Sequence, residues 1–142
     1  MPFDKNFVIK KLEMIAEYTK ELKELLEYSD NDIFADHNKL HSAERLVQLV
    51  VDLMLDVNQH FIRELDLKIP DELRGTFIIL GENGILPQEF AEKIAPLTGV
   101  RNILVHQYER IEKDLFMRNL RKNFGDLQEY QKHIFKYLEN LT

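Results

Sequence analysis

The stretch Val100–Tyr108 carries the residue types of this sequence that are best suited to chemistry. Arg101, Asn102, His106 and Tyr108 are interleaved there with four aliphatic residues. An imidazole titrates near neutral pH and can move a proton in either direction, while a guanidinium holds two phosphate oxygens in a fixed fork. This combination of side chains is suited to proton transfer beside a phosphate.

Helical spacing places these residues on different faces. Each residue of an ideal helix turns by about 100°, so Asn102 and His106 share one face and Leu104 and Tyr108 share another. Arg101 and His106 are separated by about 140°. One straight helix cannot aim both side chains at one atom unless it bends, Arg101 reaches across, or a second copy contributes. We therefore expect a shared, dimeric site.

Composition alone favours an ordinary structural role for the same residues. His106 would then be a helix-end histidine, Arg101 a surface cation and Tyr108 a packing aromatic. Among the five histidines, His37 and His41 alone have a metal-ligand spacing, four residues apart. His37 is expected in a loop and no third ligand is evident, so we expect no metal site.

The motif and its flanks resemble a known protein family. Residues 101–108, Arg-Asn-Ile-Leu-Val-His-Gln-Tyr, are similar to the Arg-x4-His-x-Tyr signature of the HepT-like branch of the HEPN superfamily, small helical proteins that include RNase toxins. Residues 43–52 resemble the second long helix of that family, and residues 77–80 and 84–87 follow in the family's order. The resemblance covers about residues 40–125.

The resemblance implies a metal-independent endoribonuclease toxin of a type II-like toxin–antitoxin system, with no cofactor. His106 would act as general base or acid toward a ribose 2′-hydroxyl, and Arg101 would stabilise charge on the phosphate. Asn102, on the His106 face, would orient the imidazole or donate to the phosphate. A 2′-hydroxyl nucleophile would restrict the substrate to RNA and leave a cyclic phosphate.

The resemblance also implies a partner, a cognate minimal nucleotidyltransferase that acts as antitoxin. Family precedent includes AMP transfer (AMPylation) onto the tyrosine of the His-x-Tyr motif, here Tyr108. AMP at Tyr108 would place bulk and negative charge two residues from His106 and so repel RNA. An alternative is a non-catalytic partner or substrate-binding subunit of the nucleotidyltransferase, and both interpretations can hold. A purely structural helical dimer is a third.

Length and charge limit the broad class. A chain of 142 residues fits one domain spanning residues 1–142. The net charge of −6 argues against wholesale capture of nucleic acid. From Arg101 to Lys122, however, six cations face three anions, which indicates either a local phosphate-binding surface or a solvated helix face. Without cysteine, an 18-residue apolar run or a signal peptide, the protein is expected to be cytoplasmic, away from membranes.

Apolar periodicity predicts an all-α, up-and-down bundle of four to five helices, like that of the HEPN family. The breaks between helices follow from proline, glycine and turn-forming polar residues, while residues 30–38 remain an unassigned loop. A kink or restart is expected near residues 95–99, at Pro96. The expected helices are Phe7–Glu27, Lys39–Leu65, Asp71–Leu80, Pro87–Leu97 and Ile111–Leu141.

The helix expected from Lys39 to Leu65 has an unusually wide apolar face. One row, spaced by three and four residues, forms the core, and a second row of leucines lies beside it. The second row is more than one partner helix needs, which favours a subunit contact in addition to the bundle interior. The first row is Ala43, Val47, Val50, Met54, Val57 and Phe61, and the second is Leu46, Leu49 and Leu53.

Overall fold

The computed structural model describes residues 3–141, and the regular elements among them are all helical. The predicted all-α bundle is confirmed. None of the described helices is long and apolar enough to cross a lipid bilayer. The elements in order are α1 (Lys5–Leu25), α2 (Asp30–Ala35), α3 (His37–Glu64), α4 (Arg74–Glu82), α5 (Gln88–Ile94), α6 (Leu97–His106), the 3-10 turn η1 (Tyr108–Arg110) and α7 (Lys113–Glu139).

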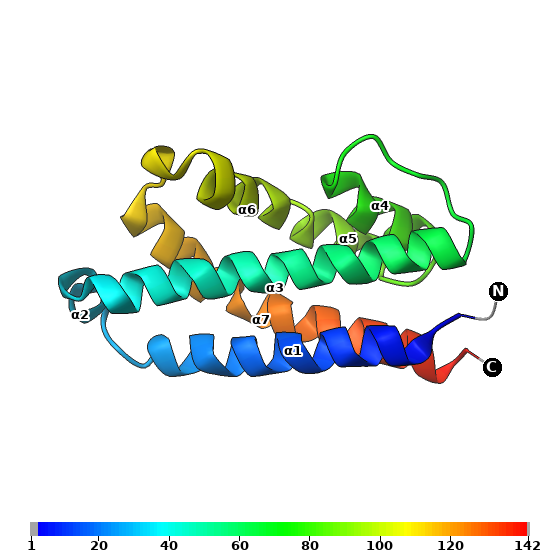
Figure 1. Ribbon diagram of the computed structural model, residues 1–142, viewed down its shortest axis with the longest axis horizontal. Coiled ribbons are helices and arrows are strands. Elements are labelled where there is room, and N and C mark those ends of the chain that lie inside the picture. The colour runs from blue at the N-terminus through cyan, green and yellow to red at the C-terminus, as the bar shows by residue number, and fades with distance from the viewer. Residues whose placement is uncertain (1–2, 142) are drawn as a thin grey trace.

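Helix α3 lies at the centre of the bundle (Figure 1). It has α1 on one side and the short helices α4, α5 and α6 on the other, and α7 runs along α1 to close the bundle. The chain reverses direction between α1 and α3, between α3 and the segment α4–α6, and again between α6 and α7, which gives the up-and-down topology (Figure 1). Helix α6 is antiparallel to α3 and packs against it, so the Val100–Tyr108 segment lies beside the first half of α3.

Both apolar rows of α3 are covered within one chain. The first row, from Ala43 to Phe61, is buried throughout. In the second row Leu46 and Leu53 are also buried, and Leu49 is half-buried. The neighbours of α3 on its two sides therefore account for the wide face, because α1 covers one flank and α4 and α6 cover another. The width of this face is not a reason to expect a second subunit.

The segment 30–38 is helical, so the expected loop there is wrong. Ser29 caps α2 by accepting a hydrogen bond from the backbone N–H of Asp32, and Ile33 of α2 is fully buried. Asp36 then caps α3, which begins at His37. Ser and Asp compete for backbone hydrogen bonds, and here they do so as N-caps that start helices rather than as turns that end them.

Proline divides the segment that leads to the motif, as expected. Helix α5 ends at Ile94 and α6 restarts at Leu97, directly after Pro96, because proline cannot donate the next helical hydrogen bond. Helix α6 ends at His106, and the non-helical backbone of Gln107 (φ −139°, ψ 44°) turns the chain into η1. Tyr108 therefore lies outside the helix that carries the rest of the motif.

A buried polar network joins three helices in the core. The hydroxyl of Tyr130, on α7, donates to Asn58 Oδ1 of α3 at 2.6 Å, and Asn58 Nδ2 donates to Thr76 Oγ1 of α4 at 3.1 Å. Thr76 in turn donates to the carbonyl of Leu73 at 2.7 Å. Tyr130 is fully buried, which raises the pKa of its phenol well above the ordinary value. The network fixes how α3, α4 and α7 pack together.

Candidate functional site on helix α6

Helix α6 and the turn after it are tied to α3 by two polar contacts and an apolar contact between them. In the middle of α6, Arg101 binds Asp52 of α3, and just beyond the end of α6 Tyr108 binds Glu44. Leu104 is buried between these contacts. Because the helices are antiparallel, increasing residue number in α6 and η1 matches decreasing number in α3. These contacts fix which flank of α6 faces α3.

Arg101 and Asn102 are brought together in one chain. The half-buried guanidinium of Arg101 donates from Nε to Asp52 Oδ1 at 2.6 Å, and from Nη1 to Asn102 Oδ1 at 3.1 Å. A charge-assisted bond at this distance holds the planar guanidinium in one orientation. The Nη1 edge of the guanidinium lies toward the exposed side chain of Asn102. Arg101 is therefore oriented by one carboxylate and one amide.

His106 points away from Arg101. It is the last residue of α6 and its side chain is exposed. Within residues 3–141 no hydrogen bond joins it to Arg101 or Asn102. The helix is continuous from Leu97 to His106, so the angular offset of about 140° between Arg101 and His106 persists. Arg101 faces the α3 side, whereas His106 faces solvent.

Tyr108 is held by its hydroxyl. The phenol donates to Glu44 Oε1 at 2.8 Å, and the residue remains 40% exposed. The hydrogen bond to Glu44, and secondarily burial, raise the pKa of the Tyr108 phenol above its ordinary value. The ring lies edge-on to His41, with 6.5 Å between centroids. The Tyr108 hydroxyl therefore has a hydrogen-bond partner, so Tyr108 does more than pack its ring.

Sequence reasoning missed two carboxylates that contact the predicted residues, Asp52 and Glu44. A signal for them exists in the sequence. Glu44, Gln48 and Asp52 recur every fourth residue along an otherwise apolar part of α3. Residues four apart share a helix face, so this row is a polar strip that α6 and η1 cover. A polar strip within a buried face indicates hydrogen-bonding partners on the covering element.

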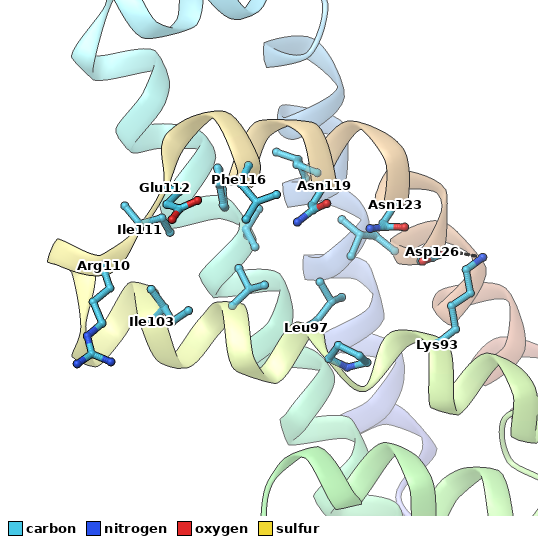
Figure 2. Close-up of a pocket in the computed structure, with 16 residues that line it drawn as sticks. Lys93, Leu97, Ile103, Arg110, Ile111, Glu112, Phe116, Asn119, Asn123 and Asp126 are labelled. Carbon is cyan, nitrogen blue, oxygen red and sulfur yellow. Dashed lines mark ion pairs between the residues drawn. The ribbon is translucent and has the colours of Figure 1, made fainter.

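Two hollows flank α6. The smaller, of about 310 Å³, is lined by His41, Glu44, Arg45, Gln48, Leu104 and Tyr108. The larger is a groove of about 500 Å³ between α6 and α7, and Figure 2 shows its apolar side chains, among them Leu97, Ile103 and Phe116, pointing into it from both helices. The ion pair of Lys93 with Asp126, 3.1 Å apart, closes one end of the groove (Figure 2). Of the predicted site residues, only Tyr108 lines either hollow.

The cations between Arg101 and Lys122 do not form one free surface. Arg101 is paired with Asp52. Arg121 is paired with Asp30 at 2.8 Å and also donates to the carbonyls of Leu26 and Tyr28, so it fastens α7 to the connection between α1 and α2. The other four, Arg110, Lys113, Arg118 and Lys122, are exposed. Fewer positive charges are therefore available to a polyanion than the six cations counted in this part of the sequence.

The two histidines with metal-ligand spacing lie on one helix. His37 is the first residue of α3, which corrects its expected place in a loop, and its ring centroid lies 5.9 Å from that of His41. Among residues 3–141 no group of three or more histidine, cysteine, aspartate or glutamate side chains is arranged to hold a metal ion.

A central helix with short helices on one side and two long helices, α1 and α7, completing the bundle defines an all-α helical-bundle protein. The family model described as Ribonuclease HepT-like matches residues 15–134, which include α6. The chain belongs to this HepT-like family of the HEPN superfamily.

Named relatives and a solved structure agree with this assignment. The chain is 31% identical to a tRNA nuclease HepT of Aphanizomenon flos-aquae, over 92% of this chain and 89% of the relative. It is 24% identical to an mRNA nuclease HepT of Shewanella oneidensis, over 88% and 93%. Its fold matches the tri-AMPylated HEPN toxin of Shewanella oneidensis in complex with its MNT antitoxin with a TM-score of 0.85, at 21% identity, covering 94% and 99% of the two chains.

Proposed function

We propose that this protein is a metal-independent endoribonuclease toxin of a toxin–antitoxin pair. The observation that carries the proposal is the family match over residues 15–134, which spans the helix on which Arg101, Asn102 and His106 lie. Relatives that match over nearly the whole chain are named as nucleases of tRNA and mRNA. The identity of the RNA differs between these two, so the proposal names RNA as the substrate class.

The proposed chemistry uses the RNA's own nucleophile. His106 takes the proton of a ribose 2′-hydroxyl, whose oxygen attacks the adjacent phosphorus, and the bond to the 5′-oxygen breaks as that oxygen takes a proton from solvent. The products are a 2′,3′-cyclic phosphate and a 5′-hydroxyl. Arg101 stabilises the charge on the phosphate oxygens, and its bond to Asp52 fixes the guanidinium in advance. Asn102 completes the site by orienting Arg101 or donating to the phosphate.

A homodimer is part of the proposal. Arg101 faces α3 and His106 faces solvent, so one chain presents them in different directions. Two copies that place their α6 helices together bring the arginine of one copy near the histidine of the other. The offset between the two residues supports this arrangement, whereas the apolar width of α3 does not.

An RNA cleavage assay with the purified, unmodified protein tests the nuclease. His106→Ala and Arg101→Ala should each lower the rate by about 100-fold or more, since a general base or a charge-stabilising donor typically contributes that much. His37→Ala removes an exposed histidine elsewhere and serves as the matched control. EDTA should leave the rate unchanged. Near-full activity of a folded His106→Ala protein, or inhibition by EDTA, would contradict the mechanism.

We further propose that a cognate minimal nucleotidyltransferase silences the toxin by attaching AMP to Tyr108. The exposed position of Tyr108, two residues beyond His106, favours this second role, and the similar Shewanella oneidensis toxin is described as AMPylated. Tyr108→Phe should keep RNA cleavage but escape silencing when it is incubated with a cognate minimal nucleotidyltransferase and ATP. Mass spectrometry of the wild type should find AMP on the Tyr108 peptide. An adduct on Tyr130 or Tyr137, or equal silencing of both proteins, would contradict it.

A further inference from the structure

The contact between Tyr108 and Glu44 joins the proposed modification site to a buried carboxylate. Glu44 is only 5% exposed, although it is an acidic residue on a helix with ample access to solvent elsewhere. Its Oε1 accepts the hydrogen bond from the Tyr108 hydroxyl. Its Oε2 is buried without a hydrogen-bond partner among residues 3–141. Burying a carboxylate is costly unless it is paired, so a carboxylate held by a phenol alone calls for an explanation.

We propose that Glu44 is the general base that takes the proton of Tyr108 when AMP is transferred to it. The inference rests on the proposed modification of Tyr108 and adds a residue to that reaction. A phenol is a weak nucleophile while it keeps its proton, and the pKa of this one is raised rather than lowered. A base already hydrogen-bonded to the hydroxyl removes this obstacle, since the 2.8 Å distance is that of a proton-transfer pair.

The atoms of the step balance as follows. The Tyr108 oxygen forms a bond to the α-phosphorus of ATP, and the bond from that phosphorus to the bridging oxygen of the β-phosphate breaks. Pyrophosphate leaves with the bonding electron pair. The phenolic proton passes to Glu44 and from there to solvent. The modified chain gains one AMP and the negative charge of a phosphodiester, and no other reactant is required.

The hollow beside Tyr108 gives the phosphate a route to the hydroxyl. It has a volume of about 310 Å³, and Tyr108 and Glu44 both line it. Arg45, exposed and adjacent to Glu44 on α3, lines the same hollow and supplies positive charge near the entering phosphate, and His41 also lines it. The base, the nucleophile and a cation therefore surround one open space.

A purely structural role for Glu44 makes a different prediction. If the carboxylate only anchored η1 to α3, any acceptor of the same shape would serve. Glu44→Gln keeps the size of the side chain and an amide oxygen that accepts from the phenol, but the amide cannot take a proton. Glu109→Gln, next to Tyr108 on the exposed turn, removes the same charge without touching the hydroxyl and is the matched control.

The test measures the initial rate at which a cognate minimal nucleotidyltransferase transfers AMP from ATP to this protein. Glu44→Gln should lower the maximal rate by about 100-fold while complex formation on gel filtration and thermal melting stay unchanged. Glu109→Gln should stay within about threefold of wild type. The slow reaction of Glu44→Gln should also accelerate with rising pH about tenfold per unit below the pKa of the phenol, because hydroxide replaces the missing base.

Each result supports or overturns the role of Glu44 as the general base. Equal rates for Glu44→Gln and Glu109→Gln, with AMP on Tyr108, would overturn the role of Glu44 and leave the modification itself standing. Absence of AMP from wild-type Tyr108 would overturn the proposed regulation and this inference with it. If Glu44→Gln failed to fold, Glu44→Asp, which keeps a carboxylate, should retain a rate within about tenfold of wild type. A folded Glu44→Asp protein that lost 100-fold would count against the base.

Discussion

Asp52 fixes the guanidinium on which the proposed phosphate contact depends. Its Oδ1 lies 2.6 Å from Arg101 Nε, and this leaves the other nitrogens of the guanidinium for a ligand and for Asn102. Misplacement of a catalytic group by about 1 Å can cost as much as 100-fold in rate. The contribution of Asp52 is therefore one of orientation, which the residue types in the motif alone do not reveal.

Replacing Asp52 with alanine should lower the maximal rate of RNA cleavage by about tenfold and change KM little, because Arg101 keeps its charge but loses its fixed direction. Steady-state kinetics on one RNA substrate would show whether the maximal rate falls while KM stays nearly constant. Asp56→Ala, one turn along α3, removes a carboxylate that pairs with Lys11 instead and is the control. A faster Asp52→Ala enzyme would mean that Asp52 withholds Arg101 from the phosphate.

The residues of the candidate site were predictable in type but not in their contacts. Spacing along one helix separates Arg101 from His106 and pairs Asn102 with His106, and the continuous α6 keeps this geometry. The carboxylates of Glu44 and Asp52 lie 64 and 49 residues away along the chain from Tyr108 and Arg101, respectively. Only the antiparallel packing of α6 on α3 brings each pair together, and local periodicity does not contain that register.

Among the elements, the network of Tyr130, Asn58 and Thr76 specifies how α7, α3 and α4 meet. Tyr130 donates to Asn58 from a fully buried position. Removing the hydroxyl would leave a buried acceptor unpaired, at a cost of about 1–3 kcal/mol. The long helices therefore depend on a polar contact within an otherwise apolar core.

Tyr130→Phe should lower the free energy of unfolding by about 1–3 kcal/mol at neutral pH. The variant should also lose less of its unfolding free energy than the wild type as the pH becomes alkaline. Burial raises the pKa of Tyr130, so above about pH 10 the unfolded chain releases a proton that the folded chain retains. Stability then falls as pH rises, by up to about 1.4 kcal/mol per pH unit from this residue. Urea titrations from pH 8 to 11 on both proteins would measure the difference, and parallel curves would contradict it.

The positions of the helices were predictable from the sequence wherever apolar residues recur at helical spacing over a long stretch. The stripe from Ala43 to Phe61 predicts α3, and Pro96 predicts the restart between α5 and α6. Helix α2 was missed because a helix of six residues is too short to show a period, and its capping Ser29 resembles a turn residue. The exit of Tyr108 into η1 depends on the single non-helical residue Gln107, for which the sequence carries no strong signal.

At the scale of the whole molecule, the separation of Arg101 and His106 predicts complementation between two inactive variants. If a site takes its arginine from one copy and its histidine from the other, a mixed dimer of Arg101→Ala and His106→Ala contains one complete site. Mixing the two proteins should therefore restore about a quarter of wild-type cleavage, since half of randomly formed dimers are mixed and each has one site of two.

Light scattering of the wild type should give the mass of a dimer at tens of micromolar. The control is a mixture of two separate preparations of Arg101→Ala, which should not regain RNA cleavage. Cleavage that stays absent in the mixture, although the mixed dimer is detected by mass spectrometry, would place the arginine and histidine of each site in the same copy.

The ends of the described chain meet at one end of the bundle, away from the turn that carries Tyr108 (Figure 1). Lys5 Nζ donates to the carbonyl of Leu141 at 2.6 Å, so a short linker suffices to join the two ends. The exposed connection between α3 and α4, which includes the 82% exposed Ile69, offers a place for new termini. A circular permutant opened there should fold, and it would begin synthesis with the motif-bearing helices and finish with α3. In this permutant α4–α7 leave the ribosome before α1–α3, and the contacts between α6 and α3 in the folded protein stay the same.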